Sequence, residues 1–291
     1  MIIIKVQGGL GNQLLQYSIG HAIATLYNKE VAYDLSFFEG ETKYTKRPYL
    51  LDKFKVDVRK ATTLEIEETR YPRGFFSKGY ALITRILNKY FFKTYYIGYN
   101  KDFFALVSKK QSLYLEGFWQ SYKYYEKILE KLSCNISLKD TTVVETFKRD
   151  VSFGSTKSVS VHIRRGDYLN KGVHIQVLSQ EYYKNAVAII EKEIETPTYY
   201  IFSDDIAWVK EEMGSLFKKV VYVSACGLTD YEEFSIMKEC NHAIIANSTF
   251  SWFSTLLTNR HNKIVVYSKD WKNSFLNNDN NICPQEWKGI Y

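Results

Sequence analysis

The sequence is poor in proline and cysteine, and it contains no long hydrophobic run. Only four of its 291 residues are proline and four are cysteine, and no stretch rich in proline or serine marks a flexible linker. The cysteines are scattered without a Cys-x-x-Cys pair, which argues against a disulfide framework or a zinc site. No stretch has the length of a bilayer-spanning helix, and the apolar run at the N-terminus is too short for a signal peptide. We therefore expect a cytoplasmic globular protein with reduced thiols.

Several motifs that mark nucleotide or metal chemistry are also missing. Gly-Lys-Ser/Thr does not occur, which excludes a P-loop, and there is no Asp-x-Asp. His and Cys residues do not cluster with the spacing of metal ligands. From these absences we expect a protein that needs neither a metal ion nor a cofactor.

The net charge is only mildly positive, because 39 Lys and Arg outweigh 32 Asp and Glu to give +7. Such an excess suits a nucleotide, an acidic glycan or an anionic membrane surface. No recognition helix or zinc-finger spacing supports nucleic-acid binding. The most basic and aromatic stretch is 71–96, within which residues 83–91 predict an amphipathic helix. This helix either packs on its own domain or makes a peripheral contact with an anionic inner membrane.

The first half opens with a buried strand over residues 2–6, a glycine-rich turn and a helix whose apolar face includes Leu15 and Ile19. A strand, turn and helix in this order offer backbone N–H groups and a helix N-terminus to an anion. The turn, GGLGNQ, lacks the third glycine of the dinucleotide fingerprint, so a purely structural turn is the alternative. Asn12 and Gln13 favour a ligand site, because they place polar side chains at the helix start.

Strands and helices alternate through the second half. The expected strands cover residues 158–163, 198–202, 220–223, 243–246 and 264–267. This alternation predicts a parallel, doubly wound sheet. In the first of these strands apolar and polar residues alternate, which is typical of a half-buried strand.

The best candidate for a domain boundary lies at residues 152–157. We expect an N-terminal domain over residues 1–155 and a C-terminal domain over residues 156–270. The remaining tail, residues 271–291, is expected to pack back on the N-terminal domain.

Polar clusters follow three of the strands in the second half. They are His162/Arg164/Arg165/Asp167, Ser203/Asp204/Asp205 and Asn247/Ser248/Thr249/Ser251. In a parallel sheet all three lie at the carboxyl edge, where α/β proteins bind ligands. Arginine pairs with diphosphate oxygens, hydroxyl and N–H groups at a helix start bind phosphate, and carboxylates accept from guanine or ribose. Each cluster alone could be a salt bridge or a helix cap, but their convergence predicts a site for a nucleoside diphosphate.

Four ordered motifs carry a family resemblance. They are GGLGNQLLQYSIGHAIA, VSVHIRRGDYL, YYIFSDD and NSTFSWFSTLL, and they extend from residue 8 to about residue 257. These motifs resemble the α-1,2-fucosyltransferases of glycosyltransferase family 11. The resemblance implies an α/β protein of GT-B type, with two facing Rossmann-like domains and the donor site in the cleft. It makes residues 1–155 the Rossmann-like domain on the acceptor side and residues 156–270 the domain that binds the GDP-sugar. It also implies inverting, metal-independent transfer of fucose from GDP-β-L-fucose.

The resemblance assigns roles to individual residues. Arg164 would contact the β-phosphate with support from Arg165, and Asn12, next to Gly11, would lie near the fucose. The other donor-binding candidates are His162 and Asp205 for guanine or ribose, Asp204 beside them, and Thr249, Ser251 and the neighbouring Ser248 for phosphate.

The general base has two candidates. An inverting displacement needs a carboxylate or an imidazole near the acceptor hydroxyl, or a leaving phosphate that takes the proton itself. The α-1,6-fucosyltransferases place a Glu about ten residues after the His of their motif, and Gly172 stands there in this sequence. Asp167 and His174 are our candidates. The alternatives are that Asp167 orients Arg165 and that His174 is an ordinary loop residue.

These features predict a galactoside α-1,2-fucosyltransferase that acts on a terminal galactose of an oligosaccharide or lipid-linked glycan, in bacterial surface-polysaccharide assembly. Aromatic residues within 119–125, or Trp271 and Trp287, are candidates for stacking on the acceptor sugar. Two alternatives stay open: a transferase for another GDP-sugar, and a catalytically silent nucleotide- or glycan-binding protein.

Overall fold

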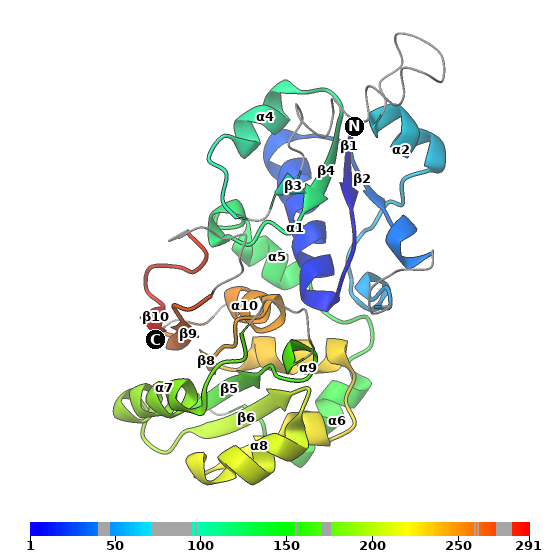
Figure 1. Ribbon diagram of the computed structural model, residues 1–291. Coiled ribbons are helices and arrows are strands. Elements are labelled where there is room, and N and C mark those ends of the chain that lie inside the picture. The colour runs from blue at the N-terminus through cyan, green and yellow to red at the C-terminus, as the bar shows by residue number, and fades with distance from the viewer. Residues whose placement is uncertain are drawn as a thin grey trace. The chain divides into compact units, whose positions relative to one another are not determined.

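The computed structural model of the chain divides into two compact units, each an α/β arrangement around a parallel sheet (Figure 1). The described residues are 1–39, 47–70, 95–96, 98–154, 156–169, 176–258, 260, 262–271 and 281–291. The first unit comprises Met1–Leu51, Val56–Ile128 and Asp279–Ile282. The second comprises Asp52–Lys55, Leu129–Asn278 and Cys283–Tyr291.

The first unit is built on a four-stranded parallel sheet in the order β2-β1-β4-β3. Its strands are β1 (Ile2–Lys5), β2 (Val31–Asp34), β3 (Tyr95–Tyr96) and β4 (Leu113–Gly117), and its α-helices are α1 (Leu10–Tyr27), α2 (Thr63–Arg70) and α4 (Phe103–Lys109). Ile2, Ile3 and Ile4 are fully buried, as the apolar run predicted. Strand β1, turn and α1 follow each other as expected.

The second unit contains a six-stranded parallel sheet in the order β10-β9-β8-β5-β6-β7. Its strands are β5 (Ser158–Ile163), β6 (Thr198–Ser203), β7 (Val220–Tyr222), β8 (His242–Ile244), β9 (Val265–Ser268) and β10 (Lys288–Ile290). Its α-helices are α5 (Leu129–Asn135), α6 (Thr142–Asp150), α7 (Gln180–Glu193), α8 (Ile206–Met213), α9 (Asp230–Glu239) and α10 (Thr249–Leu256). The predicted doubly wound parallel sheet is confirmed.

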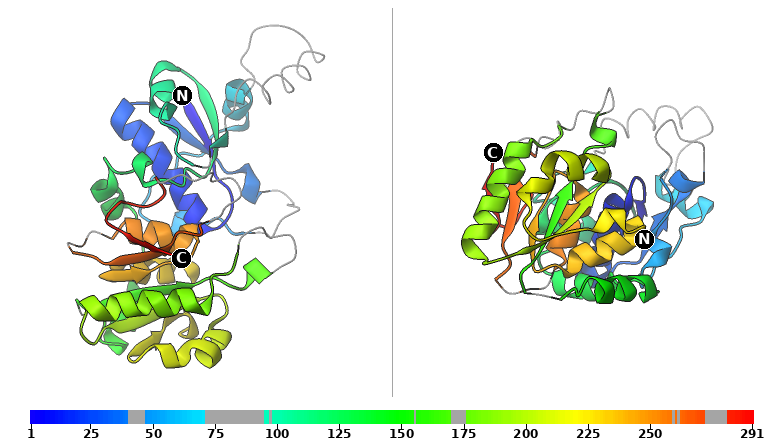
Figure 2. Two further views of the ribbon diagram at one scale, coloured as in Figure 1. Left: turned by 60° about the vertical axis from the view of Figure 1, so that its left-hand side comes forward. Right: turned by 90° about the horizontal axis from the view of Figure 1, so that it is seen from below.

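Helices cover both faces of this second sheet, as the two views of Figure 2 show. Val159, Val161 and Ile163 of β5 pack into one core with residues of α7 and α8. On the other face, the Phe234 ring of α9 packs against the Phe250 ring of α10 with centroids 5.5 Å apart. The expectation of a half-buried strand is therefore wrong, because every residue of β5 is buried. Parallel sheets are normally covered on both faces, and the serines of β5 bond to neighbouring backbone.

The strand order places a topological switch at β5. Strands β6 and β7 continue from β5 in one direction, and β8, β9 and β10 lie in the other. In a doubly wound sheet the crevice outside the carboxyl ends of the strands opens at such a switch point. The loops after β5 and β8 therefore flank the natural ligand crevice of the second unit.

The boundary between the units falls between Ile128 and Leu129, not near residue 155. Helices α5 and α6 belong with the second unit because both contact α9. Lys148 of α6 pairs with Glu239 of α9. The Lys238 ammonium donates to the carbonyls of Ser133 and Ile136, both at 2.7 Å. The tail is also shared: Asp279–Ile282 belongs to the first unit, whereas β10 extends the second sheet beside β9.

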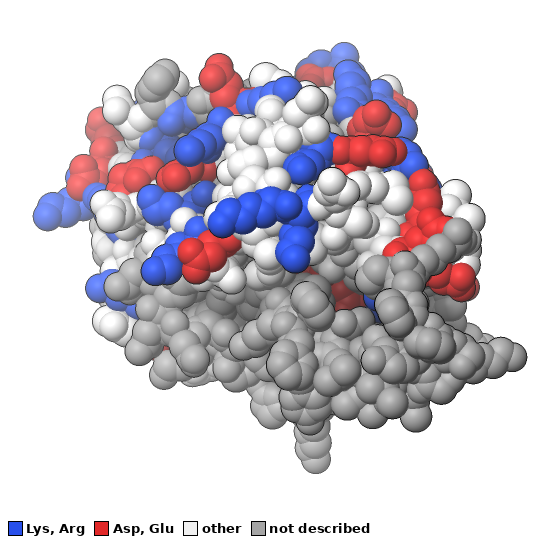
Figure 3. Space-filling view, turned by 90° about the horizontal axis from the view of Figure 1, so that it is seen from above, with Lys and Arg blue, Asp and Glu red and all other residues white. Residues whose placement is uncertain are grey.

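None of the described helices is long and apolar enough to cross a membrane. Residues 71–94, most of the stretch for which we considered membrane contact, lie outside the described residues. On the face shown in Figure 3, basic and acidic side chains of the described residues intermingle. That mixture matches the diffuse positive charge of the sequence.

Candidate active site

His162, near the end of β5, presents an unsatisfied nitrogen at the crevice. The residue is 5% exposed, and its Nδ1 has no hydrogen-bond partner in the described part of the chain. Burial, together with the nearby Arg164 charge, lowers the pKa of His162 to about 3. The imidazole is therefore neutral at physiological pH. An unpaired polar atom in a buried position is costly and is typical of a site that a ligand completes.

Arg164 is held between two carboxylates. Its Nη2 lies 2.7 Å from Asp167 Oδ2, and its Nη1 lies 3.2 Å from Asp204 Oδ2. The guanidinium also lies 5.7 Å from the ring centre of Tyr168. With 23% of its side chain exposed, Arg164 is a preoriented cation that an anion can still reach.

Arg165 has a different environment from Arg164. Its Nε donates to Asp205 Oδ2 at 3.0 Å, and its guanidinium lies 4.1 Å from the ring centre of Trp208 in α8. A planar cation held between a carboxylate and an indole braces the loop against α8. Asp167 pairs with Arg164, whereas Arg165 pairs with Asp205. That Asp167 orients Arg165 stays an alternative.

Asp204 organises the loop that carries both arginines. Its Oδ1 accepts from the backbone N–H of Arg165 at 2.9 Å, while its Oδ2 pairs with Arg164. Desolvation raises the pKa of Asp204, but the Arg164 charge and backbone hydrogen bonds from Arg165 and Gly166 together lower it. Asp204 is therefore ionised, and both its oxygens are already committed.

Gly166 leaves room for this arrangement, and Gly166→Ala tests it. A Cβ at position 166 would lie 2.8 Å from Asp204 Oδ2, so the carboxylate and the arginines it holds must shift. We expect kcat/KM to fall by about 100-fold, because even a small displacement of the arginines in a preorganised site has an effect of that size. The matched control is Gly214→Ala, where the backbone is helical and the nearest atom is the Tyr222 hydroxyl at 3.3 Å. Equal values of kcat/KM for the two variants would contradict this account.

The loop after β8 supplies the other side of the crevice. Asn247 is 6% exposed; its Nδ2 donates to the Gln176 carbonyl at 2.8 Å, and its Oδ1 has no partner in the described residues. Ser248 caps α10, and the backbone N–H groups of that helix start there. The Tyr168 hydroxyl donates to the Asn247 carbonyl at 3.1 Å, which ties the loops after β5 and β8 together. Sequence reasoning missed Tyr168, which lies inside the second motif.

The three predicted phosphate ligands in this loop differ in access. Ser248 and Thr249 are half-buried. Ser251 is fully buried, and its hydroxyl lies 3.4 Å from the carbonyls of Ala246 and Ser248, to which it donates. This geometry gives Ser251 a role within the loop, and the phosphate role of Ser248 and Thr249 stays a prediction.

The glycine-rich turn of the first unit is only partly open. Asn12 is half-buried at the start of α1, and Gly11 beside it is buried. Gln13 does not face a ligand, because it is fully buried and bonded in three directions. Its Nε2 donates to the carbonyls of Gly8 and Pro48, and its Oε1 accepts from the N–H of Leu50. Gln13 therefore ties a loop to the helix, which leaves Asn12 as the candidate.

The remaining candidates are His174 and the aromatic residues proposed to stack on the acceptor sugar. His174 lies outside the described residues. Within residues 119–125, Trp119, Tyr124 and Tyr125 are at most 1% exposed, so they pack in the core and cannot stack on a sugar. No group of three His, Cys, Asp or Glu side chains in the described part of the chain is arranged to hold a metal.

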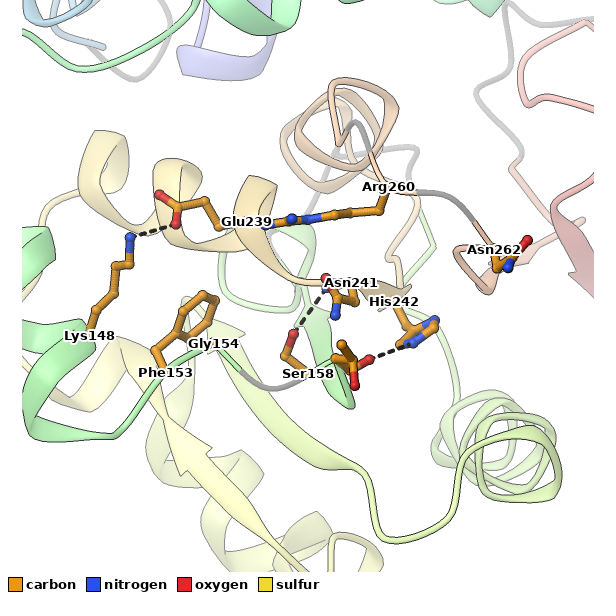
Figure 4. Close-up of a pocket in the computed structure, with 10 residues that line it drawn as sticks. Lys148, Phe153, Gly154, Ser158, Glu239, Asn241, His242, Arg260 and Asn262 are labelled. Carbon is orange, nitrogen blue, oxygen red and sulfur yellow. Dashed lines mark hydrogen bonds and ion pairs between the residues drawn. The ribbon is translucent and has the colours of Figure 1, made fainter.

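A separate hollow lies where the strands of the second sheet begin, and not at the crevice (Figure 4). Its volume is about 490 Å³. Lys148 there pairs with Glu239 at 2.6 Å. Both nitrogens of His242 are used, one toward the Thr156 carbonyl and the other by the N–H of Ile264. These polar groups are largely satisfied by one another, whereas the crevice contains buried polar atoms without partners.

Two bacterial glycosyltransferases match nearly the whole chain, and a primate enzyme matches half of it. It is 27% identical to an alpha-1,2-colitosyltransferase of Escherichia coli, over 100% of this chain and 99% of that protein. It is 25% identical to the O-antigen biosynthesis glycosyltransferase WbnK of the same species, over 97% and 98%. A galactoside alpha-(1,2)-fucosyltransferase 1 of Saimiri boliviensis boliviensis matches over 50% of this chain and 43% of that protein, at 24% identity.

Solved structures share the fold. The α-1,6-fucosyltransferase NodZ co-crystallised with GDP aligns with a TM-score of 0.52 and 15% identity, over 88% of this chain and 91% of that one. NodZ is a GT-B fucosyltransferase, so the predicted GT-B fold class is confirmed. A sequence profile described as Glycosyl transferase family 11 matches residues 1–291. The chain therefore belongs to glycosyltransferase family 11.

Proposed function

We propose that this chain transfers L-fucose from GDP-β-L-fucose to the 2-hydroxyl of a terminal galactose, with inversion and without a metal ion. The galactose belongs to an oligosaccharide or a lipid-linked glycan. The observation that carries the proposal is the crevice between β5 and β8. At these strand ends Arg164 is preoriented, and His162 Nδ1 and Asn247 Oδ1 are buried atoms without hydrogen-bond partners in the described residues. A diphosphate and its nucleoside supply the anion and the polar atoms that such a site lacks.

In the proposed reaction the galactose 2-hydroxyl attacks the anomeric carbon from the face opposite the diphosphate. The new oxygen–carbon bond forms as the bond to the β-phosphate oxygen breaks, and GDP departs with the electron pair. Arg164 stabilises the negative charge that grows on the β-phosphate, with Asp204 holding its Nη1 in place. The N–H groups at the start of α10 act in the same direction.

The proton of the attacking hydroxyl needs an acceptor. Asp167 is the described candidate, because its carboxylate lies in the same loop as Arg164 and is 37% exposed. His174 is the other candidate. When the diphosphate binds Arg164, it replaces Asp167 as the partner of Nη2, while Asp204 keeps Nη1. The Asp167 carboxylate then becomes available to the acceptor.

A second donor is favoured by one comparison. The full-length similarity to an alpha-1,2-colitosyltransferase makes GDP-colitose a specific alternative to GDP-fucose. Colitose lacks the 3-hydroxyl of fucose, so the two donors differ only in a group that the protein must either bond or bury. The α-1,2 linkage is common to both proposals.

Product analysis with a donor panel tests the function. The purified protein is incubated with GDP-fucose, GDP-colitose or GDP-mannose and a set of galactosides, and the products are identified by NMR. We expect an α-1,2-fucosyl galactoside as the main product. A product from GDP-colitose alone would replace the donor assignment, and binding of GDP without any product would favour a silent nucleotide-binding protein.

A further inference from the structure

Glu233 is a half-buried carboxylate in the first turn of α9 that has no cationic partner in the described residues. Its neighbour Glu232 belongs to the capping box with Thr229 and so serves the helix itself. Glu233 has no such role. A carboxylate at a helix N-terminus is common, but one that is removed from water without a cation needs N–H or O–H donors.

A chain of hydrogen bonds connects Glu233 to the end of β6. The Oγ of Ser224, in the turn after β7, accepts from the Ser203 N–H at 2.9 Å, which leaves the Ser224 hydroxyl proton for Glu233. The Oγ of Ser203 in turn accepts from the N–H of Asp205 at 3.0 Å. Glu233 therefore lies at the carboxyl edge of the sheet, beside the second polar cluster of the crevice.

Aromatic packing connects the same turn of α9 to His162. Phe234, the next residue, is fully buried against Phe250, and the Phe250 ring lies 5.5 Å from the imidazole of His162. The hydrogen-bond connection leads to the ends of β6 and β7, whereas the aromatic connection leads to β5 and to α10, which follows β8. A nucleoside whose diphosphate lies between β5 and β8 can extend toward β6 along the strand ends.

Asp204 and Glu233, two of the carboxylates near the end of β6, differ in how well their oxygens are bonded. Asp204 has both oxygens committed, one to the Arg165 N–H and the other to Arg164. Glu233 accepts from Ser224, but burial and the nearby Asp230 raise its pKa to about 7. Among the described residues, Ser224 is the donor that its charged form has. Guanine offers two adjacent donors, the N1–H and the 2-amino group, which match the two oxygens of one carboxylate.

We propose that Glu233 recognises the guanine base of the donor by accepting hydrogen bonds from its N1–H and its 2-amino group. This inference rests on the proposed use of a GDP-sugar. Glu233 thereby selects guanine nucleotides, while Arg164 binds the diphosphate that all nucleotide sugars share.

The test compares GDP with inosine diphosphate, which lacks the 2-amino group, by calorimetry on the full-length protein. We expect the wild type to bind GDP about tenfold more tightly than inosine diphosphate, the value of one hydrogen bond to a charged group. Glu233→Gln should weaken GDP binding by about 10- to 100-fold and bring the two affinities within about twofold. Glu211→Gln, at an exposed position on α8, is the matched control and should keep the wild-type preference.

The pH dependence of GDP binding gives a second readout. Glu233 must be ionised to accept both hydrogen bonds, so GDP affinity should fall as the pH drops below about 7. The titratable groups around it are Asp230 on α9 and Cys226 after β7, and burial raises the pKa of Cys226. Glu233→Gln should remove this pH dependence and leave only the one that comes from the titration of GDP itself. Glu211→Gln should retain both.

A Glu233→Gln protein that is folded by circular dichroism and still prefers GDP as the wild type does would overturn the inference. So would a wild type that does not distinguish GDP from inosine diphosphate. Because the test uses no sugar and no acceptor, it separates the two proposals. A wild type that selects GDP but transfers no fucose would contradict only the proposed reaction.

Discussion

Arg164→Ala is expected to lower kcat/KM for fucosyl transfer by about 10³-fold. Arg164 is the cation that the structure holds toward the crevice, with Nη2 at 2.7 Å from Asp167 and Nη1 at 3.2 Å from Asp204. Arginines that neutralise a departing phosphate contribute rate factors of about 10³ or more. Steady-state kinetics with varied GDP-fucose measures the loss, and calorimetry with GDP measures how much of it is ground-state binding.

Two further variants make the result specific. Arg164→Lys retains the charge but not the planar fork that spans both carboxylates, so we expect it to recover only part of the loss. Arg149→Ala removes an exposed arginine on α6 and should leave kcat/KM unchanged. Removal of Arg164 also leaves Asp204 without its cation and should cost about 1–3 kcal/mol of unfolding free energy, measured by urea denaturation. Near-wild-type activity of Arg164→Ala would contradict the assigned role.

Asp167→Asn is expected to lower kcat by about 10²- to 10⁴-fold without weakening the binding of GDP. The amide keeps the shape of the carboxylate but cannot take a proton, and Arg164 keeps Asp204 as its partner. Stopped assays give kcat, and calorimetry gives GDP affinity. If GDP affinity fell in parallel with kcat, Asp167 would be a residue that only positions Arg164.

His174→Ala in the same assays separates the two candidates for the base. With Asp167 as the proton acceptor, we expect the His174 variant to retain kcat within about tenfold of the wild type, since its loss removes no step. A large loss of kcat at His174 together with a small one at Asp167 would reverse the assignment.

The sheet of the second unit could be predicted from sequence because its strands are short apolar runs separated by amphipathic helices. The same pattern predicts the position of the crevice, since polar residues come directly after β5 and β6 and begin three residues after the end of β8. The degree of burial could not be predicted. Ser158, Ser160 and His162 resemble a solvent face, yet the sheet is covered on both sides and their polar atoms bond to backbone or remain unpaired.

Other features depend on contacts between residues far apart in the sequence. Gln13 looked like a ligand because it is polar and starts a helix, but the loop at Pro48 and Leu50 satisfies its amide. The division into units depends on such contacts as well, because α5 is bonded to Lys238 about 100 residues later in the chain. The partners that hold Arg165 could not be predicted either, since only the fold shows that Asp205 and Trp208 contact it.

The central claim is that this crevice releases GDP from GDP-fucose when a galactoside is present, with fixed protein cations stabilising the diphosphate. The most direct measurement is GDP release from GDP-fucose in EDTA, with and without a panel of galactosides, for the wild type and Arg164→Ala. We predict release that galactosides stimulate, that persists in EDTA and that is lost in Arg164→Ala. No stimulation by any galactoside, or release that requires a divalent metal ion, would contradict this account.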